Sequence, residues 1–494
     1  MWGGKINRRV VRFAAMKQRF FAFVLGGLLA CSVVSGAQPP NFVVIVADDM
    51  GWRDPAFMGS DYHQTPHMDR LAADGLVFTQ AYANAPVCAP TRAAILSGQY
   101  AARTGVYTVG RAPRETDGLK LRTPRNVESL DPGLITLPEA LKAAGYKTGL
   151  VGKWHLGRPT GATGPEAHGF DVAIGTARGG GTRTYYAPYG ISSLDGDAPE
   201  GQYLTNRLTD EAVGFIQDHK DRPFFLWLSH YAVHTPIEAD PKVLAQVKKR
   251  PAGDLHDHAE YAAMVESFDQ SVGRVVEALG AAGLAENTVV VFGSDNGGSR
   301  RVTRMTPLKG NKGSLSEGGV RVPCVVKYPG VVEPGRTTDT PVLLFDLFPT
   351  LLDLAEAGLS AEAKRQPVDG VSWAPLLRGQ PAPGLTDRPL VWHIPVYKTR
   401  PGGRIAGSPA TALRKGRWKL MYDYESKTSE LYDLQADVGE TKDLSDAEPG
   451  VAQELERELA AWQRRVDAEL PTPNPDYDPQ KAVDTERRGR RRDR

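Results

Sequence analysis

Short runs of apolar residues recur along the chain, and each run is continuous rather than alternating with polar positions. Continuous apolar runs of this length are typical of strands that are buried on both faces, as in a parallel sheet. The predicted strands are Phe42–Ala47, Thr148–Val151, Phe224–Ser229, Thr288–Phe292 and Val322–Val326.

Amphipathic stretches with helix signals lie between these runs. The stretch Thr65–Asp74 opens with a Thr as N-cap and a Pro at the first helical position. The stretch Thr136–Ala144 ends at Gly145, which is a common stop signal, and Tyr261–Ala281 carries a long helical pattern. Alternating strands and helices predict an α/β fold, with a large, mostly parallel central sheet flanked by helices.

The pattern changes toward the C-terminus. Short strands are predicted at Pro389–Ile394, Trp418–Tyr424 and Glu430–Leu434, and a helix at Val451–Asp467. We therefore expect a main α/β domain at 38–385 and a smaller C-terminal α+β subdomain at 386–470. Residues 471–494 are Pro-rich and then basic, and they predict a disordered tail.

The first 37 residues predict a signal peptide. A basic region with Lys17 and Arg19 precedes the apolar run Phe20–Val34, and small residues follow. The apolar run is too short for a comfortable membrane span, so none is expected after cleavage. We expect an exported protein, periplasmic or extracellular. Anchoring as a lipoprotein through Cys31 is the alternative, which Leu29 fits poorly.

Charge and cysteine content narrow the possibilities further. The 494 residues carry 60 basic and 58 acidic side chains, so the net charge of +2 gives no general attraction to nucleic acid. Of the three cysteines, Cys324 lies in a predicted buried strand and Cys88 in a motif with another role. No disulfide is predicted.

Two polar pairs follow predicted strands. Asp48-Asp49 comes after Phe42–Ala47, and Asp295-Asn296 comes after Thr288–Phe292. Either pair alone is more often a helix cap or a turn. Ligands bind beyond the carboxyl ends of strands in open α/β sheets, and carboxylate and amide oxygens suit Ca²⁺. Together the two pairs could supply four oxygen ligands to one ion.

Cys88 opens a motif with a characteristic spacing, CAPTRAAILSG at 88–98. The segment resembles the signature of the formylglycine-dependent sulfatases, C-x-P-x-R followed by an apolar stretch, Ser or Thr, and Gly. Thr91 stands where Ser is commoner. Further segments are similar to the family's blocks in the same order: TPHMDRL at 65–71, GKWHLG at 152–157, LKGNKG at 308–313 and EGGVRVP at 317–323.

The resemblance implies an alkaline-phosphatase-like fold and sulfatase activity. In this family the cysteine, here Cys88, is oxidised to formylglycine (3-oxoalanine) by a formylglycine-generating maturation enzyme. The hydrated aldehyde attacks sulfur, and its second hydroxyl lets the sulfate leave. The resemblance also implies one Ca²⁺ ion, bound by Asp48, Asp49, Cys88, Asp295 and Asn296.

The resemblance assigns roles to the remaining residues of the matched blocks. Arg92 would fix the nucleophile, while Lys153 and Lys312 would bind sulfate oxygens. His155 would be the base, and His234 would protonate the leaving oxygen, together with Lys312.

The expected substrate is a sulfated carbohydrate, with a small aryl sulfate as an alternative. Further substrate-binding candidates are Arg178, Arg183 and His393, although arginines in a Gly-rich loop can also be merely solvated. Two other functions stay open. One is a phosphonate or phosphate ester hydrolase of the same superfamily, and the other is an inactive relative that binds sulfated glycans.

Overall fold

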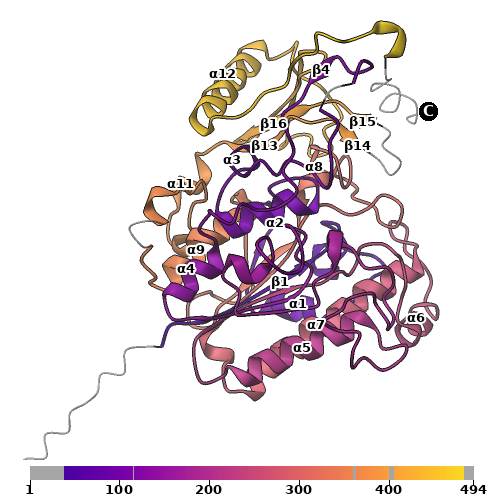
Figure 1. Ribbon diagram of the computed structural model, residues 1–494, viewed down its shortest axis with the longest axis vertical. Coiled ribbons are helices and arrows are strands. Elements are labelled where there is room, and N and C mark those ends of the chain that lie inside the picture. Colours follow the sequence, from indigo (N-terminus) through magenta and orange to yellow (C-terminus); the bar gives the residue numbers. More distant parts are fainter. Residues whose placement is uncertain (1–37, 115, 360–362, 400–404, 483–494) are drawn as a thin grey trace, which may run out of the picture. The chain divides into compact units, whose positions relative to one another are not determined.

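The computed structural model describes residues 38–114, 116–359, 363–399 and 405–482 (Figure 1). All elements below belong to the unit Pro39–Arg494. The predicted signal peptide 1–37 with Cys31 and the basic run at 487–494 lie outside the described residues.

An eight-stranded sheet forms the centre of this unit, in the order β11-β2-β10-β8-β1-β7-β5-β6. Five neighbouring strands in this order run parallel. They are β8 (Thr288–Ser294), β1 (Asn41–Ala47), β7 (Phe224–Ser229), β5 (Lys147–Gly152) and β6 (Val172–Ile174). Every residue of β1, β7 and β8 is buried, which explains their continuous apolar runs. The mostly parallel sheet predicted from the sequence is confirmed.

The predicted parallel strand Val322–Val326 is wrong, because Pro323 divides this run between two sheets. Before the proline, β9 (Arg321–Val322) joins a three-stranded sheet with β3 (Ala81–Tyr82) and β12 (Val342–Leu343). After the proline, β10 (Cys324–Lys327) pairs antiparallel with β8 and with β2 (Leu76–Phe78), and β11 (Arg336–Thr338) forms the edge. A proline lacks the N–H that would continue the ladder.

Helices cover both faces of the central sheet. Successive residues of β1 point to opposite faces: Val43 and Ile45 belong to one hydrophobic core, and Val44 and Val46 to another. The first core includes α5 (Leu204–Asp218) and α7 (Ala259–Ala281). The second includes α2 (Cys88–Ser97), α4 (Leu137–Ala143) and α9 (Leu347–Leu354). The shorter helices are α1 (Pro66–Ala73), α3 (Ala101–Thr104), α6 (Pro241–Val247), α8 (Glu317–Val320), α10 (Ala374–Leu377) and α11 (Pro383–Thr386).

The two predicted Thr caps behave differently. Thr136 begins α4 with a complete capping box, in which its side chain and that of Glu139 each accept from the other's backbone N–H. Thr65 occupies the N-cap position of α1 but makes no side-chain cap bond. Its hydroxyl instead accepts from the N–H of Ala56 and donates to Asp69. The predicted cap at Thr65 is therefore wrong, although the helix begins where expected.

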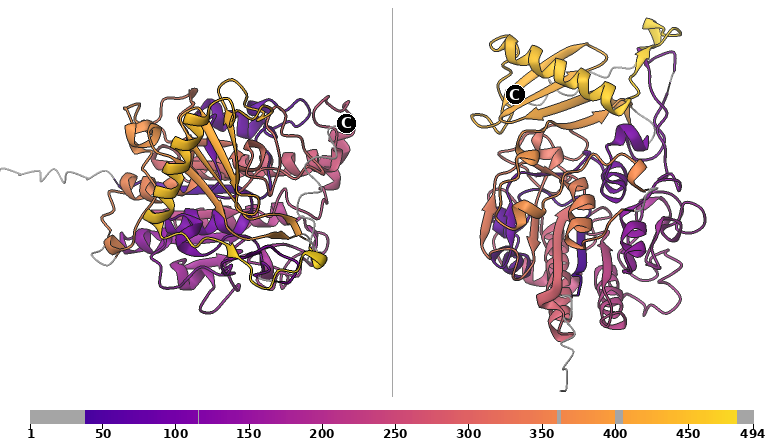
Figure 2. Two further views of the ribbon diagram at one scale, coloured as in Figure 1. Left: turned by 90° about the horizontal axis from the view of Figure 1, so that it is seen from above. Right: turned by 90° about the vertical axis from the view of Figure 1, so that its left-hand side faces the viewer.

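The C-terminal part of the unit contains a four-stranded antiparallel sheet. Its strands are β13 (Leu390–Ile394), β16 (Ala410–Lys415), β17 (Trp418–Asp423) and β18 (Thr428–Asp433). Helix α12 (Pro449–Val466) packs on β16 and β17 (Figure 2). A two-stranded ribbon, β14 (Lys398–Thr399) with β15 (Ile405–Gly407), lies between β13 and β16 in sequence. The α+β character is as predicted, but the sequence pattern missed β14, β15 and β16.

Residues 471–482, expected to begin a disordered tail, pack against an earlier segment. Strand β19 (Thr472–Pro473) pairs antiparallel with β4 (Leu121–Arg122). The amide of Asn474 donates to the carbonyls of Thr116 and Leu119. This part of the chain is therefore ordered by hydrogen bonds to a loop more than 300 residues away in sequence.

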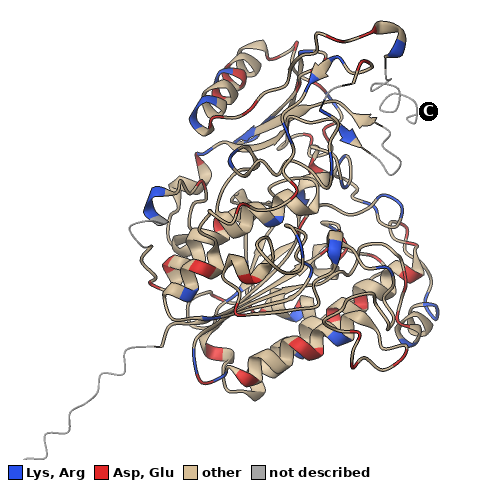
Figure 3. Cartoon of the chain, viewed as in Figure 1, with Lys and Arg blue, Asp and Glu red and all other residues tan. Residues whose placement is uncertain are grey.

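Charged residues lie mainly outside the central strands. Helices α5, α7 and α12 carry both acidic and basic residues, whereas β1, β7 and β8 carry none (Figure 3). Among the described residues, no helix is both long and apolar enough to cross a bilayer.

Candidate active site

Four neighbouring parallel strands end together at one edge of the central sheet. Register pairs Ala47 of β1 with Ser294 of β8, and Ser229 of β7 with Gly152 of β5. The next residues along β8, β1 and β5 are Asp295, Asp48 and Lys153. The fold thus brings together polar groups that lie far apart in sequence, at the edge where the sequence predicted a site.

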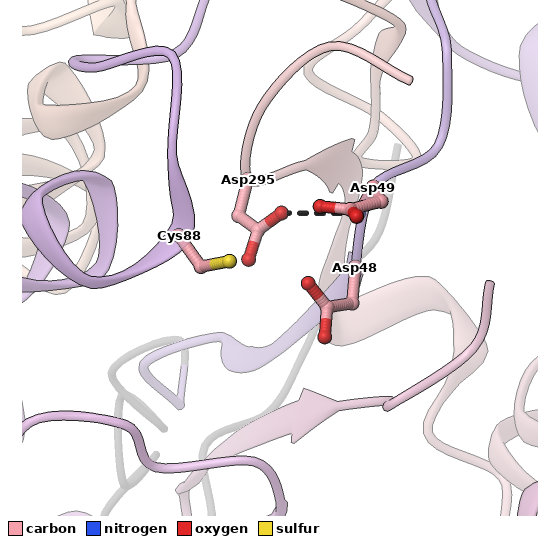
Figure 4. Close-up of side chains that lie close together, drawn as sticks. All are labelled: Asp48, Asp49, Cys88 and Asp295. Carbon is pink, nitrogen blue, oxygen red and sulfur yellow. Dashed lines mark hydrogen bonds between the residues drawn. The ribbon is translucent and has the colours of Figure 1, made fainter. Parts of the chain in front are cut away.

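Three carboxylates and one thiol converge at this edge. One ligand atom from each of Asp48, Asp49, Cys88 and Asp295 lies within 4.8 Å of the others, and all four residues are buried. The Cys88 sulfur points toward the Asp295 carboxylate, and the N–H of Asp49 donates to Asp295 Oδ1 at 3.2 Å (Figure 4). The predicted grouping of these residues around one spot is observed.

Cys88 is the first residue of α2, and the turn before it is fixed by Thr91. The Thr91 hydroxyl accepts from the N–H of Ala85 and donates to its carbonyl, both at 3.1 Å. Thr at this position therefore supplies the hydroxyl that a Ser would. Burial raises the pKa of the Cys88 thiol to about 12, although Lys153 and Lys312 act in the opposite direction. The unmodified side chain is thus a neutral thiol and a poor nucleophile.

Arg92 lies one turn after Cys88 and its guanidinium is buried. It donates to Asp295 Oδ2 at 2.7 and 2.9 Å, to the carbonyl of Lys153 at 3.2 Å and to the hydroxyl of Ser229. These bonds tie α2 to the ends of β8, β5 and β7. Sequence reasoning missed Ser229, although its place at the end of a predicted strand was a usable signal.

Two lysines pair with the two adjacent carboxylates. Lys153 Nζ lies 2.6 Å from Asp48 Oδ2, and Lys312 Nζ lies 2.7 Å from Asp49 Oδ1. Burial acts to raise the pKa of Asp48, but Lys153, His234 and Arg92 outweigh it and lower that pKa, so the carboxylate is charged.

The loop that carries Lys312 is held by backbone bonds on both sides. The N–H of Lys312 donates to the carbonyl of Gly298 at 3.0 Å, and that of Gly313 donates to Pro86 at 2.8 Å. Lys312 is therefore fixed between the loop that precedes Cys88 and the turn that follows Asp295.

The two histidines face the cluster in different ways. His155 adopts a left-handed backbone conformation (φ 61°), and burial, with Lys153 and Arg92 beside it, holds its pKa well below the usual value. It is neutral, and its buried Nδ1 has no hydrogen-bond partner among the described residues. His234 is partly exposed, with Nε2 3.7 Å from Asp49 Oδ2 and Nδ1 2.7 Å from the carbonyl of Thr235.

The cluster has the chemistry of a calcium site. Asp48 Oδ1 and Asn296 Oδ1 are buried without any hydrogen-bond partner among the described residues. Asn296 donates its Nδ2 to Asp49 Oδ1 at 2.8 Å, which leaves its oxygen as the free end. Buried oxygens without donors, next to further carboxylates, match the hard oxygen ligands that Ca²⁺ prefers. The residues present therefore fit the ion.

A pocket of about 460 Å³ opens beside the cluster, and it is lined by Ala89, His155 and Arg178 among others. Arg178 is exposed at this pocket, as expected for a substrate contact. Arg183 is also exposed but is not among the residues that line the pocket.

His393 lies away from these groups, in the core of the C-terminal sheet. It is 4% exposed, and its ring packs against Tyr107, Tyr424 and Trp462. Its Nε2 lies 3.1 Å from the carbonyl of Glu469, and its Nδ1 lies 3.4 Å from the Tyr424 hydroxyl. Neither ring nitrogen is free for a substrate, so the structure departs from the predicted substrate-binding role.

Comparisons with known proteins agree with this geometry. A family model described as Sulfatase matches residues 40–357, and one described as N-sulphoglucosamine sulphohydrolase, C-terminal, matches residues 311–465. A sulfatase from Formosa agariphila is 35% identical over 90% of this chain and 94% of its own length. The steryl-sulfatase of Mus musculus is 34% identical over 69% of this chain and 65% of its own length. The solved structure of Ps i-CgsB in complex with k-i-k-neocarrahexaose is 30% identical, covers 86% of this chain and 93% of that chain, and gives a TM-score of 0.73.

Proposed function

The chain belongs to the sulfatase family, whose members hydrolyse sulfate esters, and from this premise we propose that its substrates are sulfated carbohydrates, cleaved with Cys88 as formylglycine beside one Ca²⁺ ion. One observation carries the proposal. Cys88, Asp48, Asp49 and Asp295 offer ligand atoms within 4.8 Å of one another, beside two lysines and two histidines.

The two added groups supply the chemistry that the twenty amino acids lack. Formylglycine, as its hydrate, supplies one hydroxyl to attack sulfur and a second whose deprotonation lets the sulfate leave. Calcium would be held by Asp48, Asp49, Asp295, Asn296 and the modified Cys88, and it would supply positive charge that favours the ionised nucleophile and the sulfate group.

The chain's own residues position the sulfate and move the protons. Lys153 and Lys312 offer two cationic heads within reach of the cluster, which suits the equatorial oxygens of a sulfate group. His155 is neutral with a free Nδ1, so it can accept a proton from the nucleophile. His234 is more exposed, which suits a group that protonates the leaving alcohol oxygen at the mouth of the site.

The pocket beside the cluster supports a carbohydrate substrate. Ten of its twelve lining residues are polar or glycine, and Thr108, Ser129 and Thr163 offer hydroxyl groups. A sterol would require a largely apolar wall, because burying its rings beside hydroxyls and charges gains little. The relatives include steryl-sulfatases and a protein whose structure was solved with a neocarrahexaose. The lining favours the second kind of ligand.

Export and maturation complete the proposal. The basic and apolar pattern of residues 1–37 supports export to the periplasm or the exterior, with a lipid anchor on Cys31 as the alternative. A formylglycine-generating enzyme would act on the segment CAPTR at 88–92. Arg178 stays a proposed substrate contact, and Arg183 is proposed only for a substrate that extends beyond the pocket.

Mass spectrometry of the active enzyme tests the central claim. The peptide that spans Cys88 should be about 18 Da lighter than its unmodified sequence, as the exchange of a thiol for an aldehyde requires. The peptide with Cys324, a buried thiol in β10, should keep the mass of cysteine and serves as the internal control. An active enzyme whose Cys88 is unmodified would refute the formylglycine mechanism.

Kinetics test the bond that is cleaved. The enzyme should release inorganic sulfate from sulfated saccharides, and Cys88→Ala should lower kcat/KM by about 10³-fold or more, because the nucleophile is lost. Parallel rates on aryl sulfate and aryl phosphate esters address the phosphate or phosphonate alternative, and a strong preference for phosphate would overturn the assignment. Wild-type protein that binds sulfated glycans without hydrolysing them would instead indicate an inactive binding relative.

A further inference from the structure

The pocket beside Cys88 carries two arginines with no acidic partner. Arg158 and Arg178 both line it and both are exposed. No ion pair of either guanidinium is found among the described residues, although most of the buried cations at the site are paired. The one acidic residue of the lining, Glu128, lies 3.4 Å from Arg111, which offsets its charge. The lining of the pocket therefore carries an excess of positive charge.

The backbone places Arg158 at the lining of this pocket. Gly157 has a φ of 140°, and a Cβ at this position would lie 2.5 Å from the carbonyl oxygen of Thr163. The N–H of Arg158 donates to the Thr163 hydroxyl at 3.1 Å, and the indole of Trp154 donates to the Thr163 carbonyl at 2.9 Å. A tight turn held by Thr163 thus fixes the start of the Arg158 side chain, three residues after His155 in the sequence.

The same pocket contains an exposed apolar side chain. Val109 is 38% exposed, and the only other large hydrophobic residue that is exposed in the described part of the chain is Leu470. An isolated apolar group among hydroxyls and glycines suits the C–H face of a sugar ring rather than a fully apolar ligand. The pocket thus offers one contact for a ring face and two for negative charge.

We propose that this pocket binds a sugar that carries a second anionic group, a carboxylate or a sulfate, in addition to the sulfate that is cleaved, and that Arg158 and Arg178 determine this specificity. The inference rests on the proposed function and narrows its substrate class. The cleaved sulfate is accounted for by Lys153 and Lys312, whereas the two arginines lie outside that set. A guanidinium binds carboxylate or sulfate oxygens through paired N–H donors, and an unpaired one at a pocket wall is available for that contact.

Matched saccharides test the inference. Three substrates share the same cleavable sulfate, and the second position carries a carboxylate, a second sulfate or a neutral hydroxymethyl group. We expect wild-type kcat/KM to be about tenfold or more higher for at least one anionic substrate than for the neutral one. Which anion is preferred identifies the source of the charge. Arg158→Gln and Arg178→Gln should each lower this ratio about threefold or more, and the double variant should bring it close to one.

A matched control and a binding experiment separate the possible failures. Arg222→Gln removes an exposed arginine at the opposite end of β7 and should leave the ratio at its wild-type value. Titration of the same saccharides into Cys88→Ala protein measures binding to the pocket without turnover. The order of affinities should match the order of the wild-type kcat/KM values. Equal rates and equal affinities for anionic and neutral saccharides would overturn the inference while sulfate hydrolysis stands. Absence of any sulfate release, with the order of affinities intact, would refute the proposed function but support the anion pocket.

Discussion

His155 is held by the backbone of a neighbouring loop. Its φ of 61° is uncommon for a residue with a side chain, and such conformations persist only where the surroundings enforce them. Gly180 packs directly on the imidazole, since a Cβ built there would lie 2.0 Å from Cγ of His155. The orientation of the proposed base thus depends on the absence of one methyl group.

Gly180→Ala should therefore move the His155 ring and lower kcat by about 10- to 100-fold, because a shift of about 1 Å in a reacting group has this effect. Gly201→Ala is the matched control: Gly201 has the same φ of 74°, so both variants strain the backbone equally, but a Cβ at Gly201 meets nothing within 4 Å. Steady-state kinetics with an aryl sulfate compare the two. Equal kcat values for the two variants would show that the contact with His155 is unimportant.

The carboxylate cluster predicts a dependence of stability on calcium. Asp48, Asp49 and Asp295 are buried within one small volume, and Asp48 and Asn296 each keep an oxygen without a donor. Calcium at 100 times its Kd should stabilise the folded state by about 2.7 kcal/mol, and chelation should remove this gain. Thermal unfolding with EGTA and with added Ca²⁺ measures the difference. Asn296→Ala should weaken the stabilisation by Ca²⁺. A melting temperature that changes with neither EGTA nor Ca²⁺ would contradict the calcium site.

Residues that follow a strand were predictable, because sheet topology brings the ends of parallel strands together. Asp48 and Asp295 were found in this way, and Lys153 through the family resemblance of its segment, whereas His393 was misplaced. Its burial depends on Glu469 and Trp462, which come more than 60 residues later in the chain and carry no recognisable pairing signal. Arg158 was overlooked because its lack of an acidic partner is a property of the folded surface.

At the scale of elements, a buried charge network joins the segment that follows the Lys312 loop to the C-terminal sheet. Lys419 of β17 lies 2.8 Å from Glu317 Oε1, at the start of α8, and 2.9 Å from Glu440 Oε1. Neither Lys419 nor the two carboxylates is exposed. Tyr82 of β3 donates to the second oxygen of Glu317 at 2.7 Å. Lys419 thus contacts carboxylates from two separate segments. The first of them, Glu317, comes five residues after Lys312 in the sequence.

Lys419→Met should destabilise the fold by about 3–5 kcal/mol, since it removes the one cation that contacts both buried carboxylates and leaves Glu317 only Arg321, at 3.5 Å. Lys415→Met is the control on the neighbouring strand β16, where the pair with Glu458 is partly exposed and should contribute at most about 1 kcal/mol. Urea unfolding of the two variants gives the comparison. Similar midpoints would mean that the buried network adds no more than a surface pair.

Apolar runs located the central strands but not their direction. A continuous run reports burial on both faces, which β10 shares with its parallel neighbours although it runs antiparallel. Strand β16, with the sequence ATALRK, was missed because its charged end resembles a turn. It is nevertheless central in its sheet, between β13 and β17. The direction of β10 and the formation of β16 both depend on which strands pair with them, and the apolar pattern along the sequence does not contain that information.

Across the whole molecule, buried histidines recur in separate regions. His63 and His230 are 3% and 0% exposed. Their rings pack against His256 and Phe268 respectively, whereas His393 packs against Trp462 in the C-terminal part. Burial lowers the pKa of His63 to about 4, that of His230 to about 3 and that of His393 to about 4. All three are neutral in the folded state near pH 7, and no catalytic role is proposed for them.

These lowered pKa values make the fold sensitive to acid. Between pH 6.5 and about 4 the unfolded chain binds protons on these histidines and the folded chain does not, so stability is complete above pH 6.5 and falls as the pH drops. Each histidine should remove up to about 1.4 kcal/mol per pH unit in this range, beyond what the carboxylates contribute. Urea unfolding midpoints measured from pH 7.5 to 4.5 give the slope of stability against pH. His63→Gln should flatten it, while replacement of the partly exposed His219 by Gln should leave it unchanged. A slope that stays the same without His63 would mean that another group carries the acid sensitivity.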